Sequence, residues 1–340
     1  MSLVVLDADV LGRARTGDET YVRNLLRELP GPATEAGLRL AAVTRRPELV
    51  PDGIEPIALT GAVQELRMLW TVPRALRRVG AALVHTQYAV PWRCPCPAVV
   101  TVHDLSFERD TTAMGWRDRR VFRTVVPRAA RTARRVLTVS ERSKADLVEL
   151  YGLAPDKVVV TPNGVDLAFT PGPAPAGTRL FALAVGAVQA RKNQLAALTA
   201  ARANGLELVV VGPVKDKAVA ARLRAAGATL AGYVSQERLV ELYRAAACLI
   251  QSSRYEGFGL PVVEALACGL PVVCVDEPAL REVVGAAGVV VPEAELAAGV
   301  ARALAEREPL VAAGLARASD FSWAACARRT VEVYVEAVSR

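Results

Sequence analysis

The sequence has few of the residues from which metal and redox sites are usually built. Its 340 residues include only two histidines, His85 and His103, and none of its six cysteines belongs to a CxxC pair. A zinc site with Cys and His ligands is therefore not expected. Most of the thiols are typical of small buried apolar side chains in a reducing compartment.

Long apolar stretches are missing as well. No segment approaches the ~20 uncharged apolar residues that a helix needs to cross a bilayer. The N-terminal MSLVVLDADV has neither the basic start nor the long apolar run of a secretion signal. We therefore expect a cytoplasmic protein, with a peripheral position at the inner face of the cell membrane as the open alternative.

What the chain does contain is enough apolar surface for two ordinary α/β domains. Hydrophobic residues make up 52% of the sequence, which is typical of a well-packed globular protein and not of a disordered one. The formal net charge of +7 suits an anionic ligand or surface without identifying it.

Short Val- and Leu-rich runs alternate with amphipathic stretches along the chain, which indicates parallel sheets with crossover helices. The pattern breaks at TPGPAPAGT, where Pro and Gly exclude a strand or helix. Ligands of two such α/β units are expected in a cleft between the carboxyl ends of both sheets. We predict a Rossmann-like domain over 1–169, a linker over 170–178, a second Rossmann-like domain over 179–320, and over 321–340 a helix that packs back on the first domain.

The most informative segment, residues 251 to 274, reads QSSRYEGFGLPVVEALACGLPVVC and carries Glu256 and Glu264. The two glycines of its EGFG turn allow the backbone to approach a ligand, and the helix predicted after the turn offers free N–H groups to a phosphate. Helical rise puts the two carboxylates up to roughly 12 Å apart, which is more than a glycosidase acid/base pair uses. Clamps on the two ends of one extended ligand fit this spacing better, and ordinary surface charge is the alternative.

At this segment the sequence resembles a known family. EGFGLPVVEALACGLPVV looks like the E-x7-E signature of retaining GT-B-type glycosyltransferases, in particular the mannosyltransferase-like members of glycosyltransferase family 4. The resemblance implies that Glu256 contacts the donor sugar next to the chemistry and that Glu264 holds the ribose of a nucleotide. It also implies that the turn lies against sugar and phosphate through Gly257, Phe258, Gly259 and Leu260.

A second matching segment, AVGAVQARKNQ, opens the predicted donor domain directly after its first strand. Arg191 and Lys192 at such a turn would neutralise a diphosphate, Arg as a fork and Lys as a point charge. The segment resembles the family's G-x4-RKN motif, which begins here at Gly186 and implies that both cations bind the donor phosphates. Many relatives carry an arginine where this chain has Ala187. Two solvated basic residues at a helix start are the alternative.

In the first half, PAVVTVHDLSF places His103 at the end of a buried strand. The family's TVHDL histidine lies beside the donor sugar, which makes His103 a candidate catalytic residue, with a satisfied core or loop histidine as the alternative. For His85 we favour a structural role. The glycine loop of TGDETYVRNLL also resembles the family and makes Gly17 a candidate contact to the donor, although Asp18 and Glu19 depart from the usual pattern.

Four further positions match family segments and are candidate donor contacts. Ser140 follows the strand RRVLTVS, and Asn163 lies in TPNGVDLAF; both also suit capping or turn roles. Tyr233 and Val234 lie in GYVSQERL, which in the family borders the nucleotide base, and Tyr233 could equally be a core residue.

Two competing function classes rank below this one. LDADV contains Asp7 and Asp9, as a metal-dependent GT-A enzyme would need, but relatives show LDAR there, so we expect no metal. Residues 109 to 135 contain nine arginines and would suit an anionic membrane or nucleic acid, although a solvated helix face is the simpler explanation. A GT-B-fold epimerase is a further alternative.

We therefore expect a metal-independent, retaining glycosyltransferase without a cofactor. Its donor is a nucleoside-diphosphate sugar, GDP-mannose first and a UDP-sugar next. Its acceptor is a glycan or a lipid-linked glycan, in polysaccharide, glycolipid or other glycoconjugate synthesis. Peripheral membrane contact through residues 109 to 135 is an open possibility, and no nucleic-acid partner is expected.

Overall fold

The computed structural model describes residues 1–13, 16–60, 67–110, 114–173 and 180–339. The chain forms two compact units. Unit 1 comprises Met1–Leu105, Trp116–Gly164 and Ser322–Arg340, and unit 2 comprises Ser106–Gly115 and Val165–Phe321. Of the linker predicted from the sequence, residues 174–178 lie outside the described residues.

Unit 1 is built on a parallel sheet of seven strands in the order β3-β2-β1-β4-β5-β6-β7. The order reverses between β1 and β4, which is where ligands bind in open parallel sheets. Its strands are β1 (Ser2–Asp7), β2 (Leu38–Thr44), β3 (Glu55–Ala58), β4 (Leu83–Gln87), β5 (Ala98–Thr101), β6 (Arg135–Thr138) and β7 (Val158–Val160).

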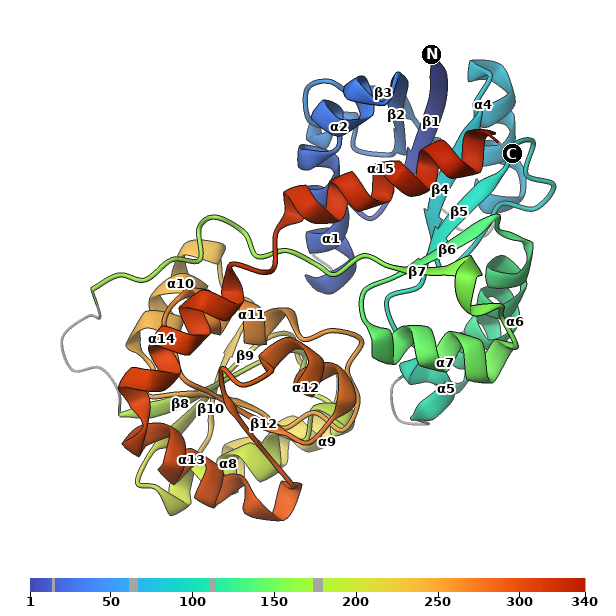
Figure 1. The fold of residues 1–340 in the computed structure, drawn as a ribbon. Helices are drawn as coiled ribbons and strands as arrows, with labels where there is room; N and C mark the ends of the chain where they lie inside the picture. Colours follow the sequence, from blue (N-terminus) through green and yellow to red (C-terminus); the bar gives the residue numbers. More distant parts are fainter. Residues whose placement is uncertain (14–15, 61–66, 111–113, 174–179, 340) are drawn as a thin grey trace. The chain divides into compact units, whose positions relative to one another are not determined.

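Helices cover this sheet, and the last one comes from the far end of the chain (Figure 1). Helix α15 packs against α1 and α2 and against β4, β5 and β6. The helical elements of unit 1 are α1 (Thr16–Glu28), α2 (Pro30–Glu35), η1 (Pro47–Leu49), the π-helical turn η2 (Arg67–Thr71), α4 (Val72–Val79), α6 (Trp116–Thr132), α7 (Glu141–Tyr151), η3 (Pro155–Lys157) and α15 (Trp323–Ser339).

Unit 2 repeats the plan with six parallel strands in the order β10-β9-β8-β11-β12-β13. Here the order reverses between β8 and β11. Its strands are β8 (Phe181–Val185), β9 (Glu207–Val211), β10 (Thr229–Gly232), β11 (Leu249–Gln251), β12 (Val272–Val275) and β13 (Val289–Val291).

The helices of unit 2 follow its strands in alternation. Helix α11 packs against α12 and α14, and α13 packs against α8 and the neighbouring strands. The helical elements are α5 (Ser106–Arg109), η4 (Ala190–Lys192), α8 (Gln194–Ala203), α9 (Lys217–Ala225), α10 (Gln236–Ala245), α11 (Leu260–Ala267), α12 (Pro278–Val284), η5 (Glu293–Glu295), α13 (Leu296–Ala305) and α14 (Arg307–Ala318).

The two parallel sheets with their helices confirm the predicted α/β fold with two doubly wound units. The central strands are Val-rich and buried because helices cover both faces of a parallel sheet. Ser140 caps α7 by accepting a hydrogen bond from the Ser143 N–H, which is the capping role its sequence position suits, and Gly152 ends that helix in the left-handed conformation. Among the described helices, none combines the length and the apolar character needed to cross a bilayer.

Candidate functional site

The candidate site in unit 2 lies where its strand order reverses. Strand β8 leads through Gly186 to η4, which ends at Lys192, and the adjacent β11 leads through the EGFG turn to α11. Carboxyl ends of neighbouring parallel strands lie at the same edge of a sheet. The fold thereby brings together two segments that lie more than sixty residues apart in sequence.

Three side chains hold the carboxylate of Glu256, which is only 7% exposed. Lys192 Nζ lies 2.5 Å from its Oε1, and Arg191 Nη1 lies 3.5 Å from its Oε2. Gln251 Nε2 donates a second hydrogen bond to Oε1, at 2.7 Å. Arg191 also donates to the carbonyl of Tyr255, which fixes its guanidinium beside the turn.

This environment keeps Glu256 ionised. Burial by itself would raise the pKa of the carboxyl, but the charges of Lys192 and Arg191 and hydrogen bonds from Lys192 and Ser253 outweigh it and lower the pKa to about 2. At neutral pH the site therefore contains two cations and one anion. The remaining positive charge suits an anionic group such as a diphosphate.

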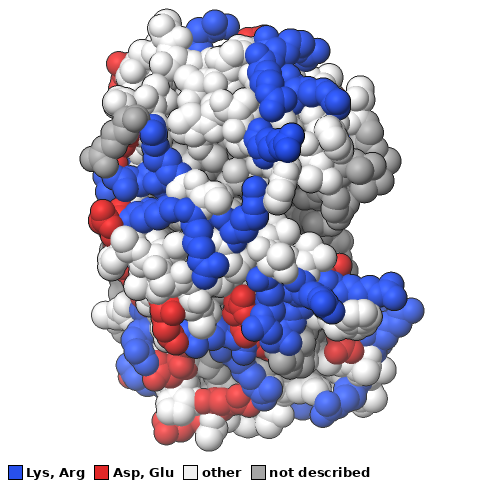
Figure 2. Space-filling view, turned by 90° about the vertical axis from the view of Figure 1, so that its right-hand side faces the viewer, with Lys and Arg blue, Asp and Glu red and all other residues white. Residues whose placement is uncertain are grey.

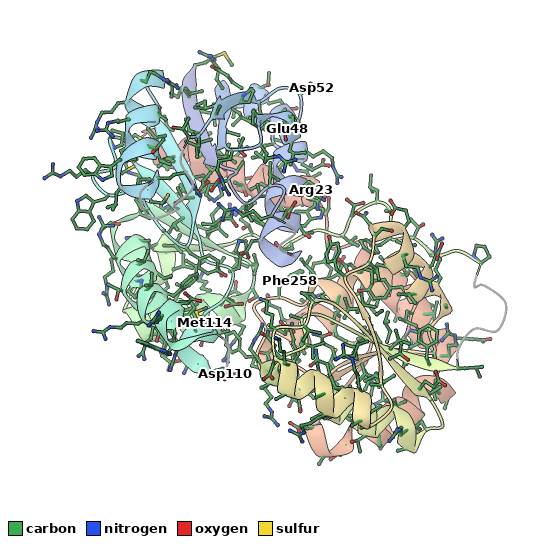
Figure 3. All side chains as sticks on the ribbon, turned by 180° about the vertical axis from the view of Figure 1, so that it is seen from behind. Arg23, Glu48, Asp52, Asp110, Met114 and Phe258 are labelled. Atoms are coloured by element: carbon green, nitrogen blue, oxygen red, sulfur yellow. The ribbon has the colours of Figure 1, made fainter. Side chains whose placement is uncertain are left out.

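Glycines shape the turn between Glu256 and α11 and the segment that follows β8. Gly259 caps α11 at a φ of 111°, which a residue with a side chain rarely adopts, and Pro261 occupies the first turn of the helix, where its fixed φ is favourable. A Cβ at Gly186 would come within 3.3 Å of Lys192 Cε, so this glycine lets the lysine cross the end of β8. Phe258, labelled in Figure 3, is buried and packs edge-on against Phe321.

Glu264 lies in α11, directly after the four residues Leu260 to Val263 that form the first turn of this helix. Its side chain is half-buried, and the Tyr243 hydroxyl donates a 2.7 Å hydrogen bond to its Oε2. Burial raises the pKa of Glu264 to about 7, and Asp166 contributes in the same direction, whereas the Tyr243 hydrogen bond lowers it. Glu264 is thus close to its titration midpoint at neutral pH, unlike Glu256.

The candidate base contacts follow β10. Tyr233 is 66% exposed, so the alternative that it belongs to the core is wrong. Val234 beside it is half-exposed. Both residues remain candidates for contact with a planar ligand.

In unit 1, the two histidines have different surroundings. His103, half-buried after β5, shares a 2.9 Å hydrogen bond with Gln87 Oε1 and has the ring of Tyr21 edge-on at 4.6 Å. Because that amide oxygen can only accept, Nε2 of His103 carries the hydrogen, and burial lowers the pKa of the ring. The imidazole is therefore a neutral hydrogen-bond donor, not a cation.

His85 is fully enclosed between β4 and α15. Its Nδ1 lies 2.6 Å from the Tyr334 hydroxyl and its Nε2 2.7 Å from Thr101 Oγ1. Burial lowers the pKa of His85 to about 3. These contacts agree with the structural role favoured for this residue.

The remaining candidates of unit 1 differ in accessibility. Gly17, in the first turn of α1, is exposed and has open space around it. Ser140 is completely buried as the cap of α7, which supports its structural alternative. Asn163 is 4% exposed after β7, and its buried Oδ1 has no hydrogen-bond partner among the described residues.

Two contacts of the site were not anticipated from the sequence. Gln251 and Tyr243 hold the two glutamates, yet one ends an apolar strand and the other lies in an amphipathic helix. A glutamine in the otherwise apolar run CLIQ was the available signal, because a buried amide needs polar partners. Within the described residues, no group of three or more His, Cys, Asp and Glu side chains is arranged to hold a metal ion.

Family models match both halves of the chain. A model described as Glycosyltransferase Family 4 matches residues 15–169, and a model described as Glycosyl transferases group 1 matches residues 170–315. The boundary between the two matches falls beside the start of unit 2.

Curated relatives are similar over much of the chain. One is the O-antigen chain mannosyltransferase B of Escherichia coli, 33% identical over 60% of this chain and 61% of its own length. Another is the MMP alpha-(1->4)-mannosyltransferase of Mycolicibacterium hassiacum, 33% identical over 72% of this chain and 66% of its own length. The chain thus spans less than two thirds of the length of each.

The fold is also found among solved structures. The sucrose-phosphate synthase of Thermosynechococcus elongatus superposes with a TM-score of 0.79 over 99% of both chains. At 22% identity this likeness shows the shared two-unit GT-B architecture and no more.

Proposed function

The chain belongs to the glycosyltransferases of family 4 and group 1, and from this membership we propose that it is a retaining hexosyltransferase. It moves a hexose from a nucleoside-diphosphate sugar to an acceptor hydroxyl, without a metal ion or cofactor. The observation that carries the proposal is the pairing of Lys192 and Arg191 with Glu256 where the strand order of unit 2 reverses.

The cations supply the main chemical contribution. The bond from the sugar to the diphosphate breaks as negative charge gathers on the departing phosphate oxygens. Arg191, Lys192 and the positive N-terminal end of the α11 dipole stabilise that charge. We infer that the acceptor hydroxyl attacks on the face from which the diphosphate departs, while a phosphate oxygen of the leaving group helps to take the hydroxyl proton.

When the donor binds, its diphosphate has to replace the Glu256 carboxylate as the partner of Lys192. The carboxylate of Glu256 holds Lys192 and Arg191. A diphosphate of higher charge competes for the same two cations. Glu256 is then released to accept hydrogen bonds from the sugar hydroxyls.

The other candidates position the rest of the donor. Glu264 accepts from the ribose hydroxyls, the exposed Tyr233 and the adjacent Val234 border the base, and Gly186 and the EGFG turn face the phosphates. The neutral His103, whose Nε2–H is held by Gln87, accepts a hydrogen bond from a sugar hydroxyl at Nδ1, next to Gly17. Asn163 offers a buried amide oxygen with no partner among the described residues, and Ser140 holds the start of α7.

Mannose is our first choice of hexose, because both relatives described above are mannosyltransferases by name. GDP-mannose is accordingly the first donor to test and a UDP-sugar the next. The acceptor is a glycan or lipid-linked glycan. We place the protein in the cytoplasm, at the inner face of the membrane when the acceptor is lipid-linked.

Peripheral membrane contact has support in the surface of α6. Trp116 is 70% exposed with Arg117 stacked over its ring, and Val121 on the same helix is 51% exposed. Trp and Arg together are typical of segments that lie in a bilayer interface. Figure 2 views the side on which α4 and α6 lie in Figure 1, and Lys and Arg side chains are spread over much of this face.

A thermal-shift panel tests the proposal. UDP, GDP, ADP and their sugars are each added to the protein, and one nucleotide is expected to raise the melting temperature more than the others. Stabilisation by none of them would overturn the donor site. The nucleotide sugar that raises the melting temperature most is then supplied with glycan acceptors. The anomeric configuration of the product decides between retention and inversion.

A further inference from the structure

One carboxylate in unit 1 is surrounded by three arginines. Arg45 Nε lies 2.7 Å from Oδ1 of Asp9, and the guanidinium groups of Arg13 and Arg67 both pair with Oδ2 of Asp9. These arginines come from three separate segments of the chain. Their convergence on a single side chain is therefore a product of the fold.

The cluster lies at the ligand-binding edge of the unit 1 sheet. Asp9 follows β1, Arg45 directly follows β2, and Arg67 begins η2, which leads through α4 into β4. Strands β2, β1 and β4 are neighbours, and the order of the sheet reverses between the last two. Open parallel sheets bind their ligands outside the carboxyl ends of the strands at this point.

The cluster combines buried and accessible cations. The side chain of Arg67 is 3% exposed, that of Arg13 17% and that of Arg45 37%. A second carboxyl, Asp7, is half-buried beside them, and burial raises its pKa to about 6. Three guanidinium groups from separate segments thus converge at this edge of the sheet, where their N–H donors can close around an anionic group.

We propose that Arg13, Arg45 and Arg67 bind a phosphate group of the acceptor substrate. The inference rests on the proposed function, since it concerns the molecule that receives the sugar. Guanidinium groups offer paired N–H donors that match phosphate oxygens. Asp9 is a positioning residue that orients the accessible Arg13 and Arg45. The buried Arg67 adds positive charge to the site.

Inorganic phosphate and pyrophosphate are the probes for this site. Both are expected to stabilise the full-length protein against heat, and Arg45→Gln is expected to weaken their apparent affinity at least about fivefold, because a charge-assisted pair is lost. Arg46→Gln is the matched control: Arg46 is the next residue, is exposed and pairs instead with Glu48, which Figure 3 labels. Equal losses in both variants, or no loss in Arg45→Gln, would overturn the proposal.

A second variant separates this site from the donor site. Lys192→Met removes a donor-site cation and should leave the Arg45-dependent phosphate effect in place. If phosphate no longer stabilises Lys192→Met against heat but still stabilises Arg45→Gln, phosphate binds only in unit 2 and the proposal is wrong. Nucleotide binding by Arg45→Gln, measured alongside, shows whether the proposed function stands by itself.

The source of the phosphate is distinguished in transfer assays. A soluble polyol phosphate and a lipid-linked diphosphate are compared as acceptors, each with its phosphate-free counterpart. The KM for the phosphorylated acceptor should rise about tenfold in Arg45→Gln, whereas the phosphate-free acceptor should be unaffected. If the wild-type enzyme has the same KM for the phosphorylated and the phosphate-free acceptor in both series, the three arginines do not bind an acceptor phosphate.

Discussion

Lys192 Nζ lies 2.5 Å from Oε1 of Glu256, so the cation expected to bind a diphosphate is held by the carboxylate expected to meet the sugar. The contact is buried and joins the carboxyl ends of two adjacent strands. It couples the two halves of the donor site, because a phosphate that captures Lys192 also releases Glu256. The predictions below follow from this coupling and from the surroundings of the individual side chains.

Lys192→Met should lower kcat/KM for the donor about 100-fold, because the cation stabilises charge that develops as the diphosphate departs. Steady-state kinetics with the donor found in the thermal-shift panel measures the effect. Arg302→Met is the control, since Arg302 pairs with Glu306 on an exposed face of α13. Similar activities of the two variants would exclude Lys192 from the site.

Glu256→Gln should change binding and transfer in opposite directions. Removing the carboxylate charge weakens the hold on Lys192 and Arg191, so the affinity for nucleoside diphosphate should rise a few-fold. The kcat should fall about 100-fold, because the negative charge that meets the sugar is lost. Calorimetry and transfer assays measure the two quantities. A loss of nucleotide affinity in this variant would refute the exchange of partners.

Gln251→Met should lower kcat about tenfold with little change in donor KM, because one hydrogen bond to Glu256 is lost in a buried site. Methionine keeps the length and burial of the side chain. The melting temperature reports any structural damage. A lower melting temperature with an unchanged kcat would mean that Gln251 serves only the fold.

Nucleotide affinity should depend on the ionisation of Glu264. Its pKa is raised to about 7, and the ionised carboxylate is the better acceptor for ribose hydroxyls, so affinity should rise between pH 6 and 8 by at most about tenfold. Glu264→Gln should remove this part of the pH dependence and leave only the titration of the nucleotide itself.

Tyr243→Phe tests what sets the midpoint of this pH dependence, which is the pKa of Glu264. The Tyr243 hydroxyl donates to Glu264 and lowers its pKa, so the variant should move the midpoint to higher pH. Binding isotherms across the same pH range report the shift. A midpoint that stays in place or moves to lower pH would contradict the role given to Tyr243.

Gly164→Ala should destabilise unit 1. A Cβ at this position would lie 2.1 Å from the backbone nitrogen of Trp323, where α15 begins, and backbone cannot yield as a flexible side chain can. We expect a loss of roughly 2 kcal/mol. Gly31→Ala, with open space around its Cβ, is the control in thermal unfolding. Equal melting temperatures would show that α15 adjusts.

Much of the fold could be predicted because its causes are local. The alternation of apolar runs and amphipathic stretches predicted two parallel α/β units, and Ser140 and Gly152 marked the ends of α7. The EGFG turn and the helix start at Pro261 likewise follow from the conformations that glycine and proline allow. Pairings between distant segments could not be obtained in this way.

The amino-acid sequence by itself determined the elements, the turn before α11 and the residue types of the site. Only the tertiary structure decided that Gln251 and Lys192 hold Glu256, that Tyr243 holds Glu264, and that three arginines meet at Asp9. The reason is physical. Local conformational preferences act over a few residues, whereas these contacts depend on which strands become neighbours and therefore on how the whole sheet is ordered.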